Sequence, residues 1–106
     1  TAEPPEEVPS QQVRVQFLRA GPGGTAIELI EPAAPGAPLH RFLETRGPGL
    51  HHVAFAVPDL VAALAAAAGR GLRLIDEAPR PGAHGSRVAF LHPSAAGGVL
   101  VELVQA

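Results

Sequence analysis

Apolar and β-branched residues alternate with polar ones over residues 13–19. Such alternation predicts a half-buried β-strand. A second strand is predicted at residues 25–30, after a Gly-Pro-Gly-Gly turn at residues 21–24. The acidic, proline-rich residues 1–10 precede the first strand and are interpreted as a loose lead-in or the frayed end of an edge strand. The chain therefore opens with a small β-sheet.

A short helix is predicted after these strands. Leu39, Phe42 and Leu43 recur at helical spacing, and Pro38 stands where a proline is tolerated at the start of a helix. The Gly-Pro-Gly sequence at residues 47–49 ends the pattern, so we expect a helix over residues 38–46.

The pattern changes after residue 51 and begins again with a strand. Residues 52–57 are apolar enough for a strand that is buried on both faces. Asp59 is a suitable N-cap for an Ala- and Leu-rich helix over residues 60–68, which Gly69-Arg70-Gly71 ends. Further strands are predicted at residues 72–76, 87–91 and 99–104. The second half thus has the order strand–helix–strand–strand–strand.

Composition restricts the function. The chain has 106 residues, of which 46% are hydrophobic and 17% charged, which suits one small folded domain or a duplicated pair of very small ones. Its formal net charge of −2 argues against nucleic acid or an anionic membrane as a partner. No apolar run approaches the ~20 residues of a membrane-spanning helix, so we expect a soluble, cytoplasmic protein. Without cysteine, lysine or tyrosine, the chain has no thiolate ligand, no lysine base and no phenolic proton donor.

Three residues stand out as candidates for chemistry because each is the polar exception in an apolar strand. They are Glu28, His52 and Glu102. An isolated buried carboxylate costs several kcal/mol, so it needs a partner, a shifted pKa or a metal ion. Two carboxylates and one imidazole on three strands fit a divalent cation. The alternatives are solvent-facing glutamates and a hydrogen-bonded histidine at a strand end.

Longer motifs connect the sequence to a known family. Residues 49–60, Gly-Leu-His-His-Val-Ala-Phe-Ala-Val-Pro-Asp-Leu, resemble the start of a βαβββ module in the vicinal oxygen chelate superfamily, which has the glyoxalase fold. Further stretches are similar to the methylmalonyl-CoA epimerase family, in the same order: residues 8–15, 27–32, 76–85, 88–93 and 97–103. The resemblance covers residue 7 to the C-terminus. It implies an α+β fold of paired βαβββ modules with a mixed, curved sheet that forms a metal-binding cleft.

This resemblance implies a metal-assisted 1,1-proton transfer that interconverts (R)- and (S)-methylmalonyl-CoA. Carried over by position, the family's metal ligands fall on Glu28, His52 and Glu102, and Glu102 is also the candidate catalytic acid or base. Co, Mn, Ni or Zn would suit this donor set. Alternation along the strand places His51 on the face opposite His52. The implied partners are a small acyl-CoA substrate and a second copy of the chain in a homodimer.

The sequence departs from the family pattern in two ways. The first strand and helix of the first module, with one metal-binding histidine, are missing. We therefore expect residues 1–34 to be the remainder of the first module, residues 35–49 a linking helix and loop, and residues 50–106 a complete second module. Such a chain is expected to bind metal weakly and to have little activity. Val15 also occupies a position that is Glu in some members, which leaves the second acid or base unassigned among Gln11, Gln12 and His84.

Other activities on the same fold remain as alternatives. A glyoxalase I-like lyase or isomerase uses a similar ligand set, but residues 80–85 and 97–103 favour the epimerase. An extradiol dioxygenase is disfavoured because the chain has no tyrosine. A non-catalytic binding protein of the bleomycin-resistance type becomes the favoured interpretation if the three candidate ligands do not converge.

Overall fold

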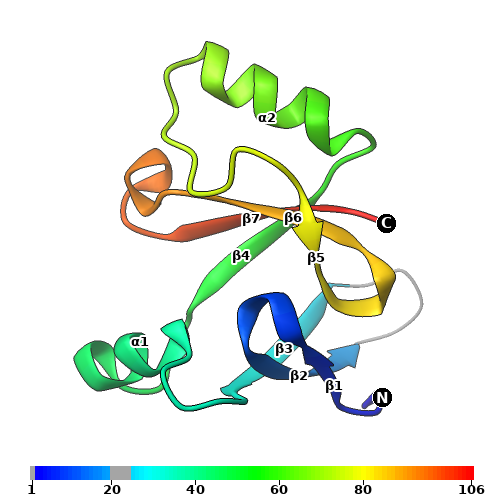
Figure 1. Cartoon of the computed structure of the whole chain (residues 1–106), viewed down its shortest axis with the longest axis vertical. Helices are drawn as coiled ribbons and strands as arrows, with labels where there is room; N and C mark the ends of the chain where they lie inside the picture. The colour runs from blue at the N-terminus through cyan, green and yellow to red at the C-terminus, as the bar shows by residue number, and fades with distance from the viewer. Residues whose placement is uncertain (1, 20–24) are drawn as a thin grey trace. The chain divides into compact units, whose positions relative to one another are not determined.

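The computed structural model describes residues 2–19 and 25–106, so the turn predicted at residues 21–24 lies outside the described residues. The chain divides after Pro48 into two compact units, residues 1–48 and residues 49–106. Within the described residues, each unit contains one sheet and one α-helix. Figure 1 labels these elements. This mixture of sheets and helices confirms the predicted α+β class.

The first unit is built on a three-stranded antiparallel sheet with the order β1-β2-β3. Strand β2 spans Val13–Arg19, as the alternating pattern predicts. Of the two interpretations of residues 1–10, the edge strand holds for β1, Glu6–Val8. A short 3₁₀ turn, η1 (Pro9–Gln11), joins β1 to β2. Strand β3 covers Ala26–Pro32 and so runs two residues beyond its predicted end. Proline is tolerated there because β3 lies at a sheet edge.

Helix α1 spans Pro38–Arg46, the predicted range. It begins with proline at the first helical position, where the missing N–H has no intrahelical partner to lose. It ends at Gly47, whose φ of 70° favours glycine and whose N–H donates to the carbonyl of Leu43. Leu39 is its buried residue.

The second unit contains a four-stranded sheet with the order β4-β7-β6-β5. Strands β4 (His52–Ala56) and β7 (Leu100–Gln105) are parallel, whereas β6 (Arg87–Leu91) is antiparallel to β7 and to β5. Strand β5 (Arg80–Pro81) is short and lies between the strands predicted at residues 72–76 and 87–91, followed by the 3₁₀ turn η2 (Ala83–Gly85). A further 3₁₀ turn, η3 (Pro93–Ala96), connects β6 to β7. The strands predicted at residues 52–57, 87–91 and 99–104 are confirmed.

Helix α2 (Leu60–Gly69) covers one face of this sheet and forms the core with it (Figure 1). Asp59 caps the helix as predicted, because its carboxylate accepts from the N–H of Ala62 at 3.1 Å. The side-chain oxygen Oε1 of Gln105, on β7, accepts a hydrogen bond from the N–H of Leu60 at 2.7 Å. This bond links the first residue of the helix to the sheet. The core cluster consists of Leu60, Leu64, Ala67, Ala89, Leu91, Val101 and Leu103.

Residues 72–76 do not form the predicted strand; they make a single bridge between Leu74 and Leu91. The N–H groups of Ile75 and Asp76 both donate to the carbonyl of Phe90, at 2.9 and 3.2 Å. The Asp76 side chain in turn accepts from the N–H of Phe90 at 2.9 Å. A side-chain carboxylate thus takes the place of a ladder carbonyl, which prevents a regular strand.

Strand β4 is not buried on both faces, contrary to the prediction. Val53 and Phe55 are 43% and 57% exposed. Their register partners, Val101 and Leu103, belong to the core under α2. Because α2 packs on β6 and β7, the helix leaves the edge strand β4 uncovered on that face.

Candidate metal and acid–base site

The candidate site of the second unit lies on the sheet face opposite α2. In the parallel pairing of β4 with β7, His52 is opposite Leu100 and Ala54 is opposite Glu102. Residues that are opposite each other, or two apart on one strand, share a face. His52 and Glu102 are therefore diagonal neighbours on one face, and the core residues Val101 and Leu103 point to the other.

The two side chains meet directly. Nε2 of His52 lies 3.1 Å from Oε1 of Glu102, and the side chains are 11% and 10% exposed. Glu102 as a whole residue is 8% exposed, so a carboxylate is buried in an apolar strand, as the sequence indicates. Burial of this group is tolerable because the imidazole supplies a polar partner.

His51 does not point to the other face, contrary to the alternation argument. Its Nδ1 lies 3.0 Å from Nδ1 of His52, and the two rings meet edge to face with centroids 5.2 Å apart. The physical reason is that β4 begins at His52. His51 precedes the strand, so the two-residue alternation of side chains does not apply to it.

Phe90 of β6 forms the apolar wall of the site. It is opposite Glu102 in the β6–β7 register, and its ring meets the edge of the His52 ring at a centroid distance of 6.1 Å. The guanidinium of Arg80 lies over the same phenyl ring at 5.1 Å. Nε of Arg80 lies 3.3 Å from Oδ2 of Asp76, so Asp76 holds both the arginine and the backbone of Phe90. The sequence analysis did not identify Asp76, Arg80 and Phe90 as neighbours of the site. Their proximity depends on the pairing of β5 with β6 and of β6 with β7, which residue spacing does not indicate.

Glu28 lies on β3 of the first unit, on the strand where the sequence places it. It is opposite Phe17 in the β2–β3 register and is half-buried. Its neighbours Ile27 and Leu29 are 63% and 51% exposed, so the apolar residues beside it are on the more exposed side of the strand. Its assignment as a metal ligand stays a prediction.

The group for the second proton transfer is not Val15, which is 2% exposed and carries no ionisable group. The residues proposed instead are Gln11 and Gln12 of the first unit and His84 of the second. Gln12 adopts a left-handed conformation with φ of 56° at the end of η1. His84 is exposed in η2 and also has a positive φ, of 57°. Their roles stay predictions.

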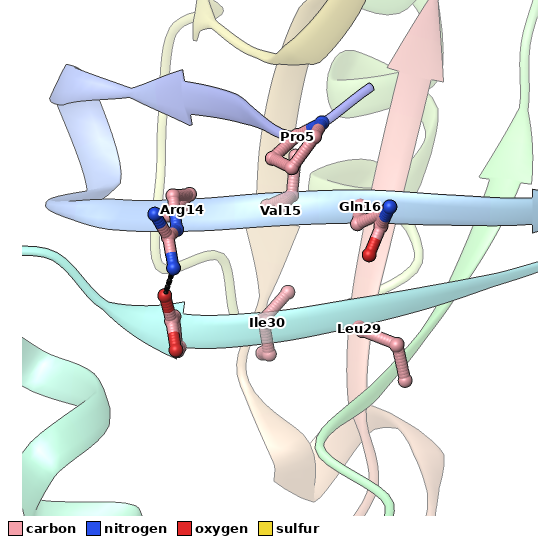
Figure 2. Close-up of a pocket in the computed structure, with 7 residues that line it drawn as sticks. Pro5, Arg14, Val15, Gln16, Leu29 and Ile30 are labelled. Atoms are coloured by element: carbon pink, nitrogen blue, oxygen red, sulfur yellow. Dashed lines mark ion pairs between the residues drawn. The ribbon is translucent and has the colours of Figure 1, made fainter. Parts of the chain in front are cut away.

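A shallow pocket in the first unit lies over β2 and β3, and Figure 2 shows its walls. Val15 and Ile30 are a register pair on these strands, and Arg14 and Glu31 form an ion pair across them. The carboxylate of Glu31 is paired with the guanidinium of Arg14. The pocket is therefore given no role in the proton transfer. It is lined by Pro5, Arg14, Val15, Gln16, Leu29, Ile30 and Glu31.

The donor atoms of the His52–Glu102 pair fit a divalent metal ion. An imidazole nitrogen and a carboxylate oxygen are ligands for the borderline divalent metals, and here they face each other with little exposure. The same carboxylate is also chemically suited to accept or return a proton. The pair thus combines a possible metal-binding group with a candidate acid–base group.

Comparison with known proteins places this chain in a family. Residues 1–90 match the sequence profile of the Glyoxalase/Bleomycin resistance protein/Dioxygenase superfamily. The uncharacterised protein YqjC of Bacillus subtilis is 45% identical over 94% of this chain and 70% of its own length. The ethylmalonyl-CoA/methylmalonyl-CoA epimerase of Cereibacter sphaeroides is 39% identical over 95% of this chain and 75% of its own length.

Structural similarity agrees with the sequence comparison. The crystal structure of methylmalonyl-CoA epimerase from Mycobacterium tuberculosis matches 99% of this chain and 70% of that chain, with 35% identity and a TM-score of 0.91. The chain belongs to the Glyoxalase/Bleomycin resistance protein/Dioxygenase superfamily and, within it, to the family of the methylmalonyl-CoA epimerases. The expected family and its glyoxalase-type fold are thereby confirmed.

The chain is shorter than the relatives it matches. It spans 61% of the mitochondrial methylmalonyl-CoA epimerase of Bos taurus, to which it is 39% identical over 99% of its own residues. In the described residues, 2–19 and 25–106, neither helix has the length and apolar character needed to cross a membrane.

Proposed function

We propose that this protein is a methylmalonyl-CoA epimerase, which interconverts (R)- and (S)-methylmalonyl-CoA by moving the hydrogen on carbon 2. The observation that supports the proposal most directly is the buried contact of 3.1 Å between Nε2 of His52 and Oε1 of Glu102. It joins a metal-binding imidazole to a proton-transferring carboxylate in a member of the epimerase family.

The chemistry of the substrate requires these residue types. The hydrogen on carbon 2 lies between a thioester and a carboxylate and is therefore already acidified. Removing it leaves negative charge that must be stabilised while a base holds the proton. Glu102 is the proposed base, because its carboxylate can take the proton at Oε1 or Oε2 and its surroundings exclude most water.

His52 and Glu102 are the proposed metal ligands of the second unit, and the family pattern adds Glu28 of the first. Such nitrogen and oxygen donors suit Co, Mn, Ni or Zn. A bound divalent ion would supply Lewis-acid stabilisation of the charge that develops on the thioester oxygen, worth several kcal/mol. The chain's own contribution is to hold the donors at a fixed separation on two neighbouring strands.

Inversion of carbon 2 requires a second group that returns the proton to the opposite side. Val15 cannot do so, because its side chain is apolar and 2% exposed. The residues to test for this role are Gln11, Gln12 and His84, of which only His84 has an ionisable side chain. Each is substituted, and hydrogen exchange at carbon 2 and net inversion are then measured separately. Loss of inversion with retained exchange would identify the second group.

We also propose that the protein acts as a homodimer on its acyl-CoA substrate. Sedimentation equilibrium across a range of protein concentrations tests this part. A mass of one chain at all concentrations contradicts the dimer and leaves the proposed chemistry untouched.

The proposed reaction is tested by incubating the protein with methylmalonyl-CoA in deuterated water after loading with Co²⁺. The signal of the hydrogen on carbon 2 is expected to disappear faster than in the protein-free control, because both half-reactions exchange it with solvent. Substrate binding without any acceleration of this exchange would overturn the proposal. It would instead favour a ligand-binding protein on the same fold.

A further inference from the structure

The contact between the two adjacent histidines is not explained by the proposed reaction. Nδ1 of His51 lies 3.0 Å from Nδ1 of His52, and Nε2 of His52 faces Glu102 at 3.1 Å. Both nitrogens of His52 are therefore occupied by defined partners within one unit. A hydrogen bond between two Nδ1 atoms needs one donor and one acceptor, so the two rings share a single proton along that contact.

We propose that His51 is a positioning residue whose Nδ1 accepts a hydrogen bond from the protonated Nδ1 of His52 and so directs the lone pair of His52 Nε2 toward a metal ion. This inference rests on the proposed function, because it assumes that His52 binds a metal. A ligating imidazole has one nitrogen without a proton, and the partner of its other nitrogen decides which one that is.

The backbone explains how His51 can take this position. β4 begins at His52, and the preceding Gly49 and Leu50 are outside any strand. A residue inside the strand would point away from its neighbour, whereas His51 turns its ring edge onto the ring of His52 at an angle of 87°. Phe90 meets the same His52 ring at an angle of 80°, so the imidazole is oriented by contacts on more than one side.

The role requires a specific pair of tautomers when a metal is bound. His52 must carry its proton on Nδ1, and His51, whose Nδ1 is then the acceptor, must carry its proton on Nε2. A histidine that serves only packing has no such requirement. The tautomer of His51 is therefore a readout that a purely structural role would not determine.

The first experiment uses ¹⁵N-histidine-labelled protein loaded with Zn²⁺, with long-range ¹H–¹⁵N correlation spectra to assign both tautomers. The expected result is a proton on Nδ1 of His52 and on Nε2 of His51. The opposite arrangement of protons, or a His51 ring that exchanges freely between tautomers, would overturn the proposal. This experiment uses the unsubstituted protein, so its result does not depend on the folding of a variant.

The second experiment measures the affinity for Zn²⁺ alone by competition with a chelator, in the variants His51→Leu and His51→Asn. Loss of a supporting hydrogen bond of this kind typically costs about 10–100-fold in metal affinity, which we expect for His51→Leu. His51→Asn keeps an acceptor oxygen near the place of Nδ1, and we expect an affinity close to that of the unsubstituted protein. Equal affinity in His51→Leu and the unsubstituted protein contradicts the role of His51.

The variant His52→Asn separates this inference from the proposed function. If His52→Asn weakens Zn²⁺ binding and His51→Leu does not, only the role of His51 is wrong. If His52→Asn leaves Zn²⁺ binding unchanged, the metal site itself is wrong and the inference fails with it. Substituting His92 by asparagine is the matched control, because its Nδ1 accepts from Ser94 at a turn and has no contact with His52 among the described interactions.

Discussion

His52 and Glu102 are separated by 50 positions in the chain, yet their side chains meet at 3.1 Å because β4 and β7 pair in parallel. Ala54 is the residue opposite Glu102, so His52 reaches the carboxylate diagonally across the strand pair. This geometry leaves both side chains on the face that α2 does not cover. A shift of one residue in the pairing would move one of them into the core face.

Replacing Glu102 by glutamine removes the proposed base and a charged ligand with almost no change in shape. Exchange of the hydrogen on carbon 2 is expected to fall by about 10²–10⁴-fold, the usual contribution of a positioned acid or base. NMR measurement of deuterium incorporation checks this result. Glu77→Gln is the control, since Glu77 is exposed in the same unit. Equal exchange rates in the two variants would remove Glu102 from the mechanism.

Replacing Leu60 by alanine is expected to destabilise the protein by about 2–5 kcal/mol, because the change leaves a cavity in a packed core. Leu60 is fully buried at the start of α2, whereas the adjacent Val61 is 58% exposed. Val61→Ala is therefore expected to stay within about 0.5 kcal/mol. Urea denaturation followed by circular dichroism measures both values, and similar losses in the two variants would contradict the placement of the core.

Replacing Gly82 by alanine introduces a steric clash in the loop beside β6. A Cβ at this position would lie 2.5 Å from Cγ1 of Val88 and 2.8 Å from Oγ of Ser86. Val88 is 1% exposed and cannot move aside easily, so we expect a loss of about 1–3 kcal/mol. Gly49→Ala is the matched control because nothing lies within 4 Å of its added Cβ. Thermal unfolding at equal heating rates compares the two, and an unchanged melting temperature for Gly82→Ala contradicts the close approach.

Replacing Asp76 by alanine removes the acceptor of the Phe90 N–H, a hydrogen bond of 2.9 Å, and the ionic partner of Arg80. Leaving such groups without their partner costs about 1–3 kcal/mol. Asp76→Asn keeps an acceptor oxygen and is expected to lose less. Hydrogen exchange of the Phe90 amide provides a local readout, which should become faster in Asp76→Ala than in Asp76→Asn. The reverse order would show that the carboxylate does not hold this part of β6.

Much of the secondary structure follows from local patterns. Strand β2 and helix α1 have the bounds that alternation, proline and glycine indicate, because these signals act within a few residues. Residues 72–76 illustrate the limit of this approach. Their apolar character suits a strand, but the Asp76 carboxylate occupies the N–H of Phe90 in place of a backbone carbonyl. That competition arises only when β6 is already in position.

The sequence by itself determined which residue types were available for chemistry and which of them interrupt apolar strands, because composition and local burial are properties of short segments. It also carried the family motifs, which named His52 and Glu102. Only the tertiary structure decided that these two side chains touch and that His51 joins them instead of turning away. The parallel pairing of β4 with β7 is set by contacts between residues far apart in the chain, and neighbouring residues do not encode it.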